Sequence, residues 1–333
     1  MENDDYSFCN ELEREAVKVF NATGLRAFER VVRNAYDYAI AKVESDSQGT
    51  KPTLSYTLQN WVGVLKSIYA AKGDIEAYLA LGNEGGLTPK DCEVLAEIYE
   101  KKRRPAEALE WVERGIEIAG RQASFGFSAY RLPLTRRRLL KRLGQASAAL
   151  QSAWEDFRSS PSTYGYDELF KYVPRSEQIE WRQKALAEAA KGEPDDFMAI
   201  CSRAKEWNRL AAFVLDASPE RLEDISHYVS EPAAAGLAKS HPAAAAKLFR
   251  ALGLRIVKAG KSKYYPEAIE NLRNAMGSYI RAGLGADWDA VVAQLRQDHG
   301  RKHGFLSGFE SMLSRKSQGA ELSYLEKAKR RWS

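Results

Sequence analysis

The stretch PEAIENLRNAMGSYIRAG, residues 266–283, decides the fold class because its apolar residues repeat with the period of an α-helix. The repeating residues are Ala268, Ile269, Leu272, Ala275, Met276, Tyr279 and Ile280. Their spacing of three and four places all of them on one stripe of a single helix. Pro266 stands at the start, where a helix leaves the N–H unpaired in any case, and Gly283 and Gly285 stand at the end. The stretch therefore predicts an amphipathic helix that needs an apolar partner surface.

Similar amphipathic stretches recur in pairs along the chain, with proline or glycine at most of the joints. The expected helices cover residues 91–100 and 106–119, 135–143 and 145–157, 166–172 and 176–191, 194–203 and 206–215, 219–228 and 232–239, and 242–258. Ala108 and Ala149 lie near the starts of two second helices, 41 residues apart, which is close to the period of helical-hairpin repeats. No convincing stretch alternates apolar and polar residues as hairpin strands do. The pattern predicts an all-α fold, an α-solenoid of tetratricopeptide-like helical hairpins.

We expect four segments along the chain. Residues 1–45 form an N-terminal helical segment, and residues 46–53, which are polar and contain glycine and proline, form a loop or hinge. Residues 54–230 form the helical-hairpin repeat array. Residues 231–333 form the basic C-terminal helical repeats.

The composition is that of a globular protein, with 333 residues that are 44% hydrophobic and 29% charged. The longest apolar runs are far shorter than the roughly 20 residues that a membrane-spanning helix needs. The acidic start has the pattern of neither a signal peptide nor a transit peptide. Cys9, Cys92 and Cys201 form no C-x-x-C pair, which favours buried thiols in a reducing compartment. We therefore expect a cytoplasmic protein that does not cross a membrane and has no cofactor.

Two blocks of the sequence resemble a known group of proteins. Residues 65–81 (LKSIYAAKGDIEAYLAL), followed by the helical pair at 92–119, resemble a bacterial family of uncharacterised helical-repeat proteins. In the tail, residues 265–268 (YPEA) open a long helix, Trp288 starts the next, and Leu295-Arg296 leads to the basic stretch RKHGF at 301–305. Similar tails follow the zinc-binding module of bacterial SWIM zinc-finger proteins.

This resemblance covers about half of the chain and implies a tetratricopeptide-like helical array. It implies no activity. The C-x-C…C-x-H signature of the SWIM module is absent from the sequence, so the resemblance does not carry its zinc site over.

The net charge of +5 hides an acidic front and a basic tail. Residues 1–100 have a net charge of −7, and residues 243–333 have a net charge of +9. Phosphate binding needs lysine and arginine on one surface, with exposed aromatic side chains nearby for stacking. The candidate polyanion-binding residues are Lys258, Lys261, Lys263, Tyr264, Tyr265, Arg296, Arg301 and Lys302. The alternative interpretation is that these cations belong to solvated turns and helix ends, where they complement the helix dipole.

Signatures of catalysis and metal binding are weak. The sequence has no P-loop, no G-x-G-x-x-G after a strand, no G-x-S-x-G and no H-E-x-x-H. His299 and His303 would share one face of a continuous helix, but Gly300 weakens a helix there, and Arg301 and Lys302 would repel a metal ion. We expect no catalytic residues and no metal site.

Three hypotheses for function follow. The first is a non-enzymatic helical-repeat scaffold that binds protein partners on its concave face. The second is nucleic-acid or polyanion binding through the basic C-terminal quarter. The third is an enzyme with a carboxylate-based site between repeats. The sequence leaves open the identity of the partner, the oligomeric state, and whether the acidic front contacts the basic tail.

Overall fold

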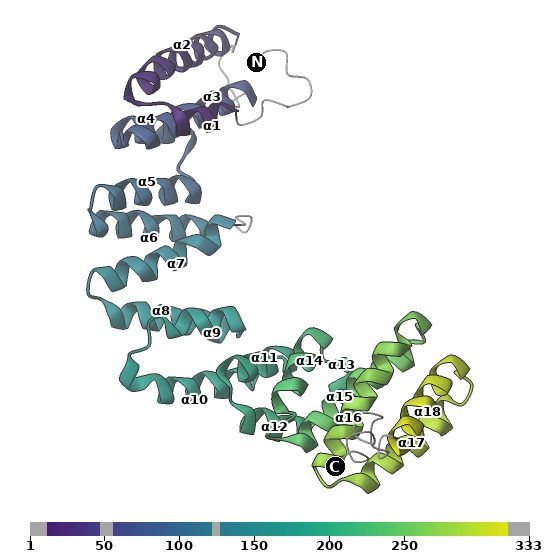
Figure 1. Cartoon of the computed structure of the whole chain (residues 1–333). Helices are drawn as coiled ribbons and strands as arrows, with labels where there is room; N and C mark the ends of the chain where they lie inside the picture. The colour runs from purple at the N-terminus through teal and green to yellow at the C-terminus, as the bar shows by residue number, and fades with distance from the viewer. Residues whose placement is uncertain (1–11, 47–55, 122–126, 319–333) are drawn as a thin grey trace, which may run out of the picture. The chain divides into compact units, whose positions relative to one another are not determined.

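The computed structural model describes residues 12–46, 56–121 and 127–318, and every regular element in these ranges is a helix (Figure 1). The α-helices are α1 (Leu12–Val19), α2 (Ala22–Asp46), α3 (Tyr56–Lys72), α4 (Ile75–Gly85), α5 (Pro89–Lys101), α6 (Pro105–Arg121), α7 (Phe127–Arg142), α8 (Ala146–Ser159), α9 (Thr163–Phe170), α10 (Gln178–Ala189), α11 (Pro194–Ala204), α12 (Trp207–Asp216), α13 (Pro219–Asp224), α14 (His227–Leu237), α15 (Pro242–Ala259), α16 (Tyr265–Arg281), α17 (Gly285–His299) and α18 (His303–Gln318). Two short 3-10 helices, Arg175–Glu177 and Ser262–Tyr264, precede α10 and α16. The all-α expectation is confirmed for the described residues.

The helices group into two compact units, Met1–Ser152 and Ala153–Ser333. No helix among the described residues is both long enough and apolar enough to cross a membrane. The predicted loop at 46–53 lies outside the described residues except for Asp46, the last residue of α2. The division of the sequence at residues 53 and 230 stays a prediction.

In the first unit, neighbouring helices pack in chain order from α2 to α7, and α5 and α6 pack most extensively (Figure 1). Tyr36, Leu65 and Ile68 are fully buried in the core of the first helices. Gly115 of α6 permits the close approach of α5 and α7. A Cβ atom at Gly115 would lie 2.8 Å from the Cβ atom of Cys92 and 3.0 Å from the Cδ1 atom of Leu132. Any larger residue at this position must therefore push the helices apart.

A buried carboxylate joins three helices of the first unit. Asp91 of α5 is 5% exposed and accepts hydrogen bonds from Lys66 Nζ on α3 and from the hydroxyl of Tyr78 on α4, both at 2.8 Å. It also forms a capping box with Thr88, whose backbone N–H donates to Asp91 Oδ2 at 2.9 Å. Burial raises the pKa of Asp91, but the hydrogen bonds from Lys66 and Thr88 outweigh burial and hold that pKa below its ordinary value.

In the second unit, α15 is the central helix and packs against α12, α13, α14 and α16. Its small residues explain how it can have so many neighbours. Ala244, Ala245 and Ala246 are fully buried, and Gly253 lies against α16. A Cβ atom at Gly253 would lie 2.8 Å from the Cγ atom of Leu272 and 3.1 Å from the carbonyl oxygen of Ala268. The stripe predicted at residues 266–283 therefore forms α16, and its buried face contacts α15.

Predicted helix boundaries are wrong at two prolines, and the helix expected at 219–228 ends at Asp224. We expected one helix to begin at residue 135, and we expected another to begin at Pro232 after a break in the chain at residues 229–231. Instead α7 runs through Pro133, and α14 runs through Pro232. A proline inside a helix removes one backbone hydrogen bond, but tertiary burial can outweigh that loss. Leu132 in α7 is fully buried, and so are the two alanines that follow Pro232 in α14.

We predict that Asp91→Ala lowers the free energy of unfolding of the first unit by about 3 to 5 kcal/mol, because it leaves the ammonium of Lys66 without its buried partner. The measurement is denaturant unfolding of the full chain, followed by circular dichroism. Asp37→Ala is the matched control, since Asp37 forms an exposed pair with Arg33 within α2. It is expected to change the free energy by less than about 1 kcal/mol. Equal losses in the two variants would contradict the prediction.

The same network predicts how stability depends on pH. Because the folded-state pKa of Asp91 is lowered, its contribution is fully present above the unfolded-state pKa of about 3.9 and is lost as the pH falls through the folded-state pKa. We expect the difference in stability between the wild type and Asp91→Ala to shrink over this acidic range. A difference that stays constant into strong acid would argue against the network.

Candidate binding surface: the α15 groove and the basic turns

Two hollows adjoin α15 in the second unit and share a wall. The first, of about 300 Å³, lies among α13, α15 and α17 and includes Glu223, Lys258 and His299 in its lining. The second, of about 370 Å³, lies mainly between α15 and α17 and includes Leu215 and Tyr279. Arg250, Val291 and Gln294 line both hollows. We call the two hollows together the α15 groove.

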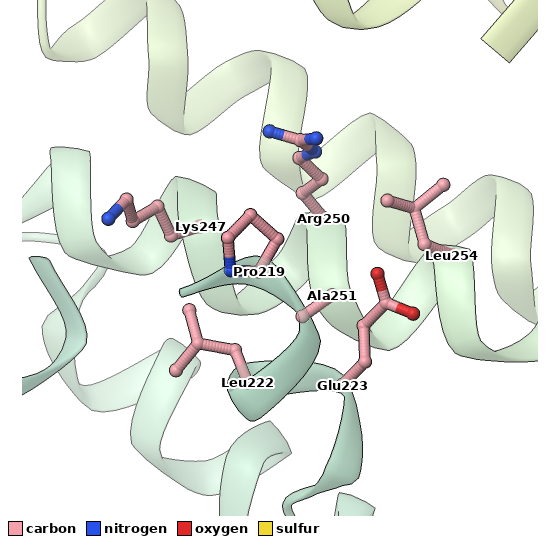
Figure 2. A pocket seen from close by; sticks show the side chains of 7 residues that line it. All are labelled: Pro219, Leu222, Glu223, Lys247, Arg250, Ala251 and Leu254. Atoms are coloured by element: carbon pink, nitrogen blue, oxygen red, sulfur yellow. The ribbon is translucent and has the colours of Figure 1, made fainter. Parts of the chain in front are cut away.

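A smaller hollow of about 20 Å³ adjoins the groove where α13 meets α15 (Figure 2). Leu222 of α13 and Ala251 of α15 line it, together with Arg250. Figure 2 shows the side chains of Lys247 and Arg250 leaving α15 in different directions, with Pro219 of α13 between them. The two cations therefore have different surroundings, although they are only three residues apart.

Two of the three lysine and arginine side chains that line the groove, Lys247 and Lys258, are bonded within the protein. Lys247 Nζ donates to backbone carbonyls at the end of α12, at 2.5 Å to Leu215 and 3.4 Å to Ala217. Lys258 Nζ lies 2.7 Å from Glu223 Oε2. Arg250 differs from both. Its Nη2 atom lies 3.4 Å from Gln294 Oε1, and its Nε atom is buried without a hydrogen-bond partner.

Two basic turns adjoin one end of the groove, where Lys258 and His299 line it. We define the first turn as residues 258–264, from the end of α15 to the start of α16, and the second as residues 299–302, from the end of α17 to the start of α18. Lys302 Nζ donates a hydrogen bond to the carbonyl of Val257 in the last turn of α15, so the two turns lie side by side. The rings of Tyr265 and Phe305 meet edge to face at 5.8 Å, which adds a second contact between the same elements.

Six of the eight predicted polyanion-binding residues lie in these turns, Tyr265 directly follows the first turn, and several of them form bonds within the protein. Lys258 pairs with Glu223, Lys302 binds a backbone carbonyl, and Tyr265 is half-buried. Arg296 lies apart from the turns, because its guanidinium forms two bonds, of 2.7 and 2.8 Å, to Glu310 of α18.

The remaining four predicted residues, Lys261, Lys263, Tyr264 and Arg301, are exposed. Lys263 Nζ lies 5.7 Å from the centre of the Tyr264 ring, which is a cation–π distance. None of the three cations has a hydrogen-bond or ion-pair partner within residues 12–46, 56–121 and 127–318. Whether these residues bind a polyanion stays a prediction.

The two histidines of the tail do not share a continuous helix, because α17 ends at His299 and α18 begins at His303. Within the part of the chain that the structure describes, no group of three His, Cys, Asp or Glu side chains is arranged to hold a metal ion. Cys92 and Cys201 are core residues, and burial raises the pKa of Cys92 to about 11 and that of Cys201 to about 12. Both thiols therefore stay protonated at neutral pH.

The candidate residues chosen from the sequence do not include Arg250 or Gln294, which line the groove. A local signal was present: Lys247 and Arg250 interrupt the otherwise apolar stretch 243–254 at a spacing of three residues. A cation on the apolar side of a helix indicates either a buried ion pair or a ligand site. Which of the two applies depends on residues of α13 and α17, which are distant in sequence.

Comparison with known proteins adds membership of a family and no activity. A family model described as "Family of unknown function (DUF6880)" matches residues 1–307. No curated protein matches the chain.

We predict that His299 reports the contact between the basic turns and α15. Burial and the charge of Lys302 lower the pKa of His299, whereas Asp298 acts in the opposite direction. Lys302→Met is therefore expected to raise this pKa, as measured by a proton NMR titration of the ring signals assigned with His299→Gln. Arg273→Met, on the exposed part of α16, is expected to leave the pKa unchanged. A pKa that is the same in the Lys302→Met variant and the wild type would contradict this arrangement.

Proposed function

Because the chain belongs to the DUF6880 family, whose function is unknown, we propose from its own residues that it is a non-enzymatic scaffold that binds protein partners. We assign the binding surface to the α15 groove. The observation that supports this proposal is the mixed lining of the groove. Apolar side chains such as Leu215 and Val291 lie beside charged and polar side chains, and among these the guanidinium of Arg250 forms no ion pair with a described carboxylate. In an interface, apolar area contributes affinity and polar groups fix the orientation of the partner.

We further propose that the helices form tetratricopeptide-like hairpins stacked as an α-solenoid. Consecutive helices that pack side by side support this proposal in both units, as α5, α6 and α7 do in the first and α14, α15 and α16 do in the second. The resemblance of residues 265–305 to the tails of SWIM zinc-finger proteins favours the same architecture. A cytoplasmic location completes the proposal and fits a partner-binding scaffold.

Polyanion binding is the second candidate function, and one specific observation favours it. Lys261, Lys263 and Arg301 are exposed and unpaired among the described residues, and the ring of Tyr264, which is 40% exposed, lies beside Lys263. Cations beside an exposed ring are the groups that bind single-stranded nucleic acid. The carboxylates in the neighbouring groove, Glu220, Glu223 and Asp298, oppose a polyanion, and for this reason we rank protein binding first.

We predict that Ala290→Trp abolishes retention of the protein partner, because the exposed Ala290 of α17 lines the groove and a tryptophan there fills it. The measurement is a pull-down with the tagged full chain from lysate of the native host, treated with nuclease and quantified by mass spectrometry. Ala293→Trp is the matched control, since Ala293 is also an exposed alanine of α17 but lines neither hollow.

The result that supports the scaffold is a defined protein retained by the wild type and by Ala293→Trp but not by Ala290→Trp. Equal retention of the partner by all three proteins would show that it binds outside the α15 groove. Loss of every partner on nuclease treatment would favour the polyanion alternative.

For that alternative we predict a steep salt dependence. Three phosphate contacts on a single strand give a slope of about −2 in a plot of log affinity against log salt concentration. The measurement is fluorescence anisotropy with a labelled single-stranded oligonucleotide. Lys261→Glu combined with Lys263→Glu is expected to remove most of the affinity, whereas Lys205→Glu with Lys239→Glu changes the net charge equally at exposed sites outside the basic turns. Equal effects of the two pairs, or a flat salt dependence, would reject specific binding at the turns.

A further inference from the structure

We propose that Arg250 anchors the α15 groove by binding a carboxylate of a partner peptide, while a large apolar side chain of the same peptide occupies the hollow between α15 and α17. This inference rests on the proposed function, protein binding in the groove. It adds the chemistry of the partner, namely an aspartate or glutamate next to a residue such as leucine or phenylalanine.

The first reason is that Arg250 is a partly buried cation with unused hydrogen-bonding capacity. A guanidinium has five N–H donors. Among the described residues, its one recorded hydrogen bond is the long contact of 3.4 Å to Gln294, and it forms no ion pair with a carboxylate. The nearby Glu223 is already paired with Lys258 at 2.7 Å. A hydrogen bond from its own backbone N–H lowers the pKa of Glu220, and the charges of Lys258 and Arg250 lower it further. Neither this carboxylate nor any other described one forms a hydrogen bond or ion pair with the guanidinium. A partly buried donor without an acceptor is unfavourable, and a carboxylate of a ligand at this position offsets that penalty.

The second reason is the position of Arg250 in the groove. It lines both hollows of the groove as well as the small hollow beside α13. A ligand that follows the groove must therefore pass its guanidinium. Figure 2 shows the guanidinium directed away from Leu222 and Ala251.

The third reason concerns the choice of anion. Carboxylates flank Arg250 on both sides, with Glu220 and Asp298 in one hollow and Asp287 in the other. These negative charges disfavour a phosphate, which carries up to two charges, more strongly than a single carboxylate. A planar guanidinium also matches a carboxylate with two parallel hydrogen bonds.

The apolar residue of the proposed peptide is inferred from the hollow of about 370 Å³ between α15 and α17. Ala243 and Leu284 line it, together with Leu215, which is 47% exposed, and Val291. An apolar side chain placed there covers surface that is otherwise exposed to water, and the removal of apolar surface from water favours binding. The groove therefore fits an acidic residue and an apolar residue that are close together in one peptide.

The experiment is a selection of random peptides displayed on phage, carried out on the full chain and on Ala290→Trp. Peptides enriched by the wild type alone are synthesised, and their dissociation constants are measured by fluorescence anisotropy. We expect the enriched sequences to share an aspartate or glutamate beside a large apolar residue. Changing that acid to its amide is expected to weaken binding to the wild type by about 10-fold to 100-fold.

Arg250→Met keeps the apolar stem of the side chain and removes the charge. We expect it to weaken binding of the acidic peptide by a similar factor and to bind the amide peptide no more weakly than the wild type does. Arg250→Lys is expected to give an intermediate affinity, because it retains the charge without the paired hydrogen bonds. Arg273→Met, an exposed arginine of α16 paired with Glu270, is the matched control and is expected to have no effect. Unchanged thermal unfolding of each variant confirms that it is folded.

The outcomes separate this inference from the proposed function. If no peptide is enriched by the wild type over Ala290→Trp, protein binding in the groove is wrong, and the inference fails with it. If enriched peptides lack an acid, or if the amide change weakens binding equally in Arg250→Met, the groove binds peptides but Arg250 does not select a carboxylate. Tighter binding of a phosphoserine peptide than of the matching aspartate peptide would assign the anchor to a phosphate instead.

Discussion

The close approach of α15 to α16 is the constraint on which the second unit depends. Gly253 has no room for a Cβ atom against Leu272 and the carbonyl of Ala268, and three consecutive alanines of the same helix are fully buried. Small residues allow one helix to contact several others, because the distance between helix axes is set by the side chains at the contact. This packing uses the apolar side of α15 for the core and leaves Arg250 at its edge, where α17 forms the opposite wall of the groove.

Fold class could be predicted from the sequence because it depends on local periodicity. The apolar stripe at 266–283 and the amphipathic stretch at 91–100 both lie in helices close to the expected bounds. The errors at Pro133 and Pro232 have a different origin. Local rules treat a proline as the end of a helix, whereas the helices continue because Leu132 and Ala233 are buried against other elements. Burial of this kind cannot be derived from the neighbouring residues in the sequence alone.

The candidate site was less predictable for the same reason. The chain has 50 lysines and arginines, and a count of charge along the sequence treats them alike. In the folded chain, Lys258 is neutralised by Glu223 and Arg296 by Glu310, while Arg250 has no carboxylate partner among the described residues. Whether a cation has a carboxylate partner depends on which helices pack next to it in the fold. The clustering of Lys258 and Lys302 was expected from charge alone, but the hydrogen bond that ties one turn to α15 was not.

The walls of the α15 groove are assembled from widely separated parts of the chain, from Pro219 in α13 to His299 in α17. A ribosome releases the chain in order, and local helices form long before distant ones can pack together. A nascent chain that has reached α15 therefore exposes the side of that helix around Arg250 without an opposite wall. The α15 groove forms only after α17 has been translated and has packed, so a newly made molecule lacks the groove, and with it the proposed partner site, through most of its synthesis.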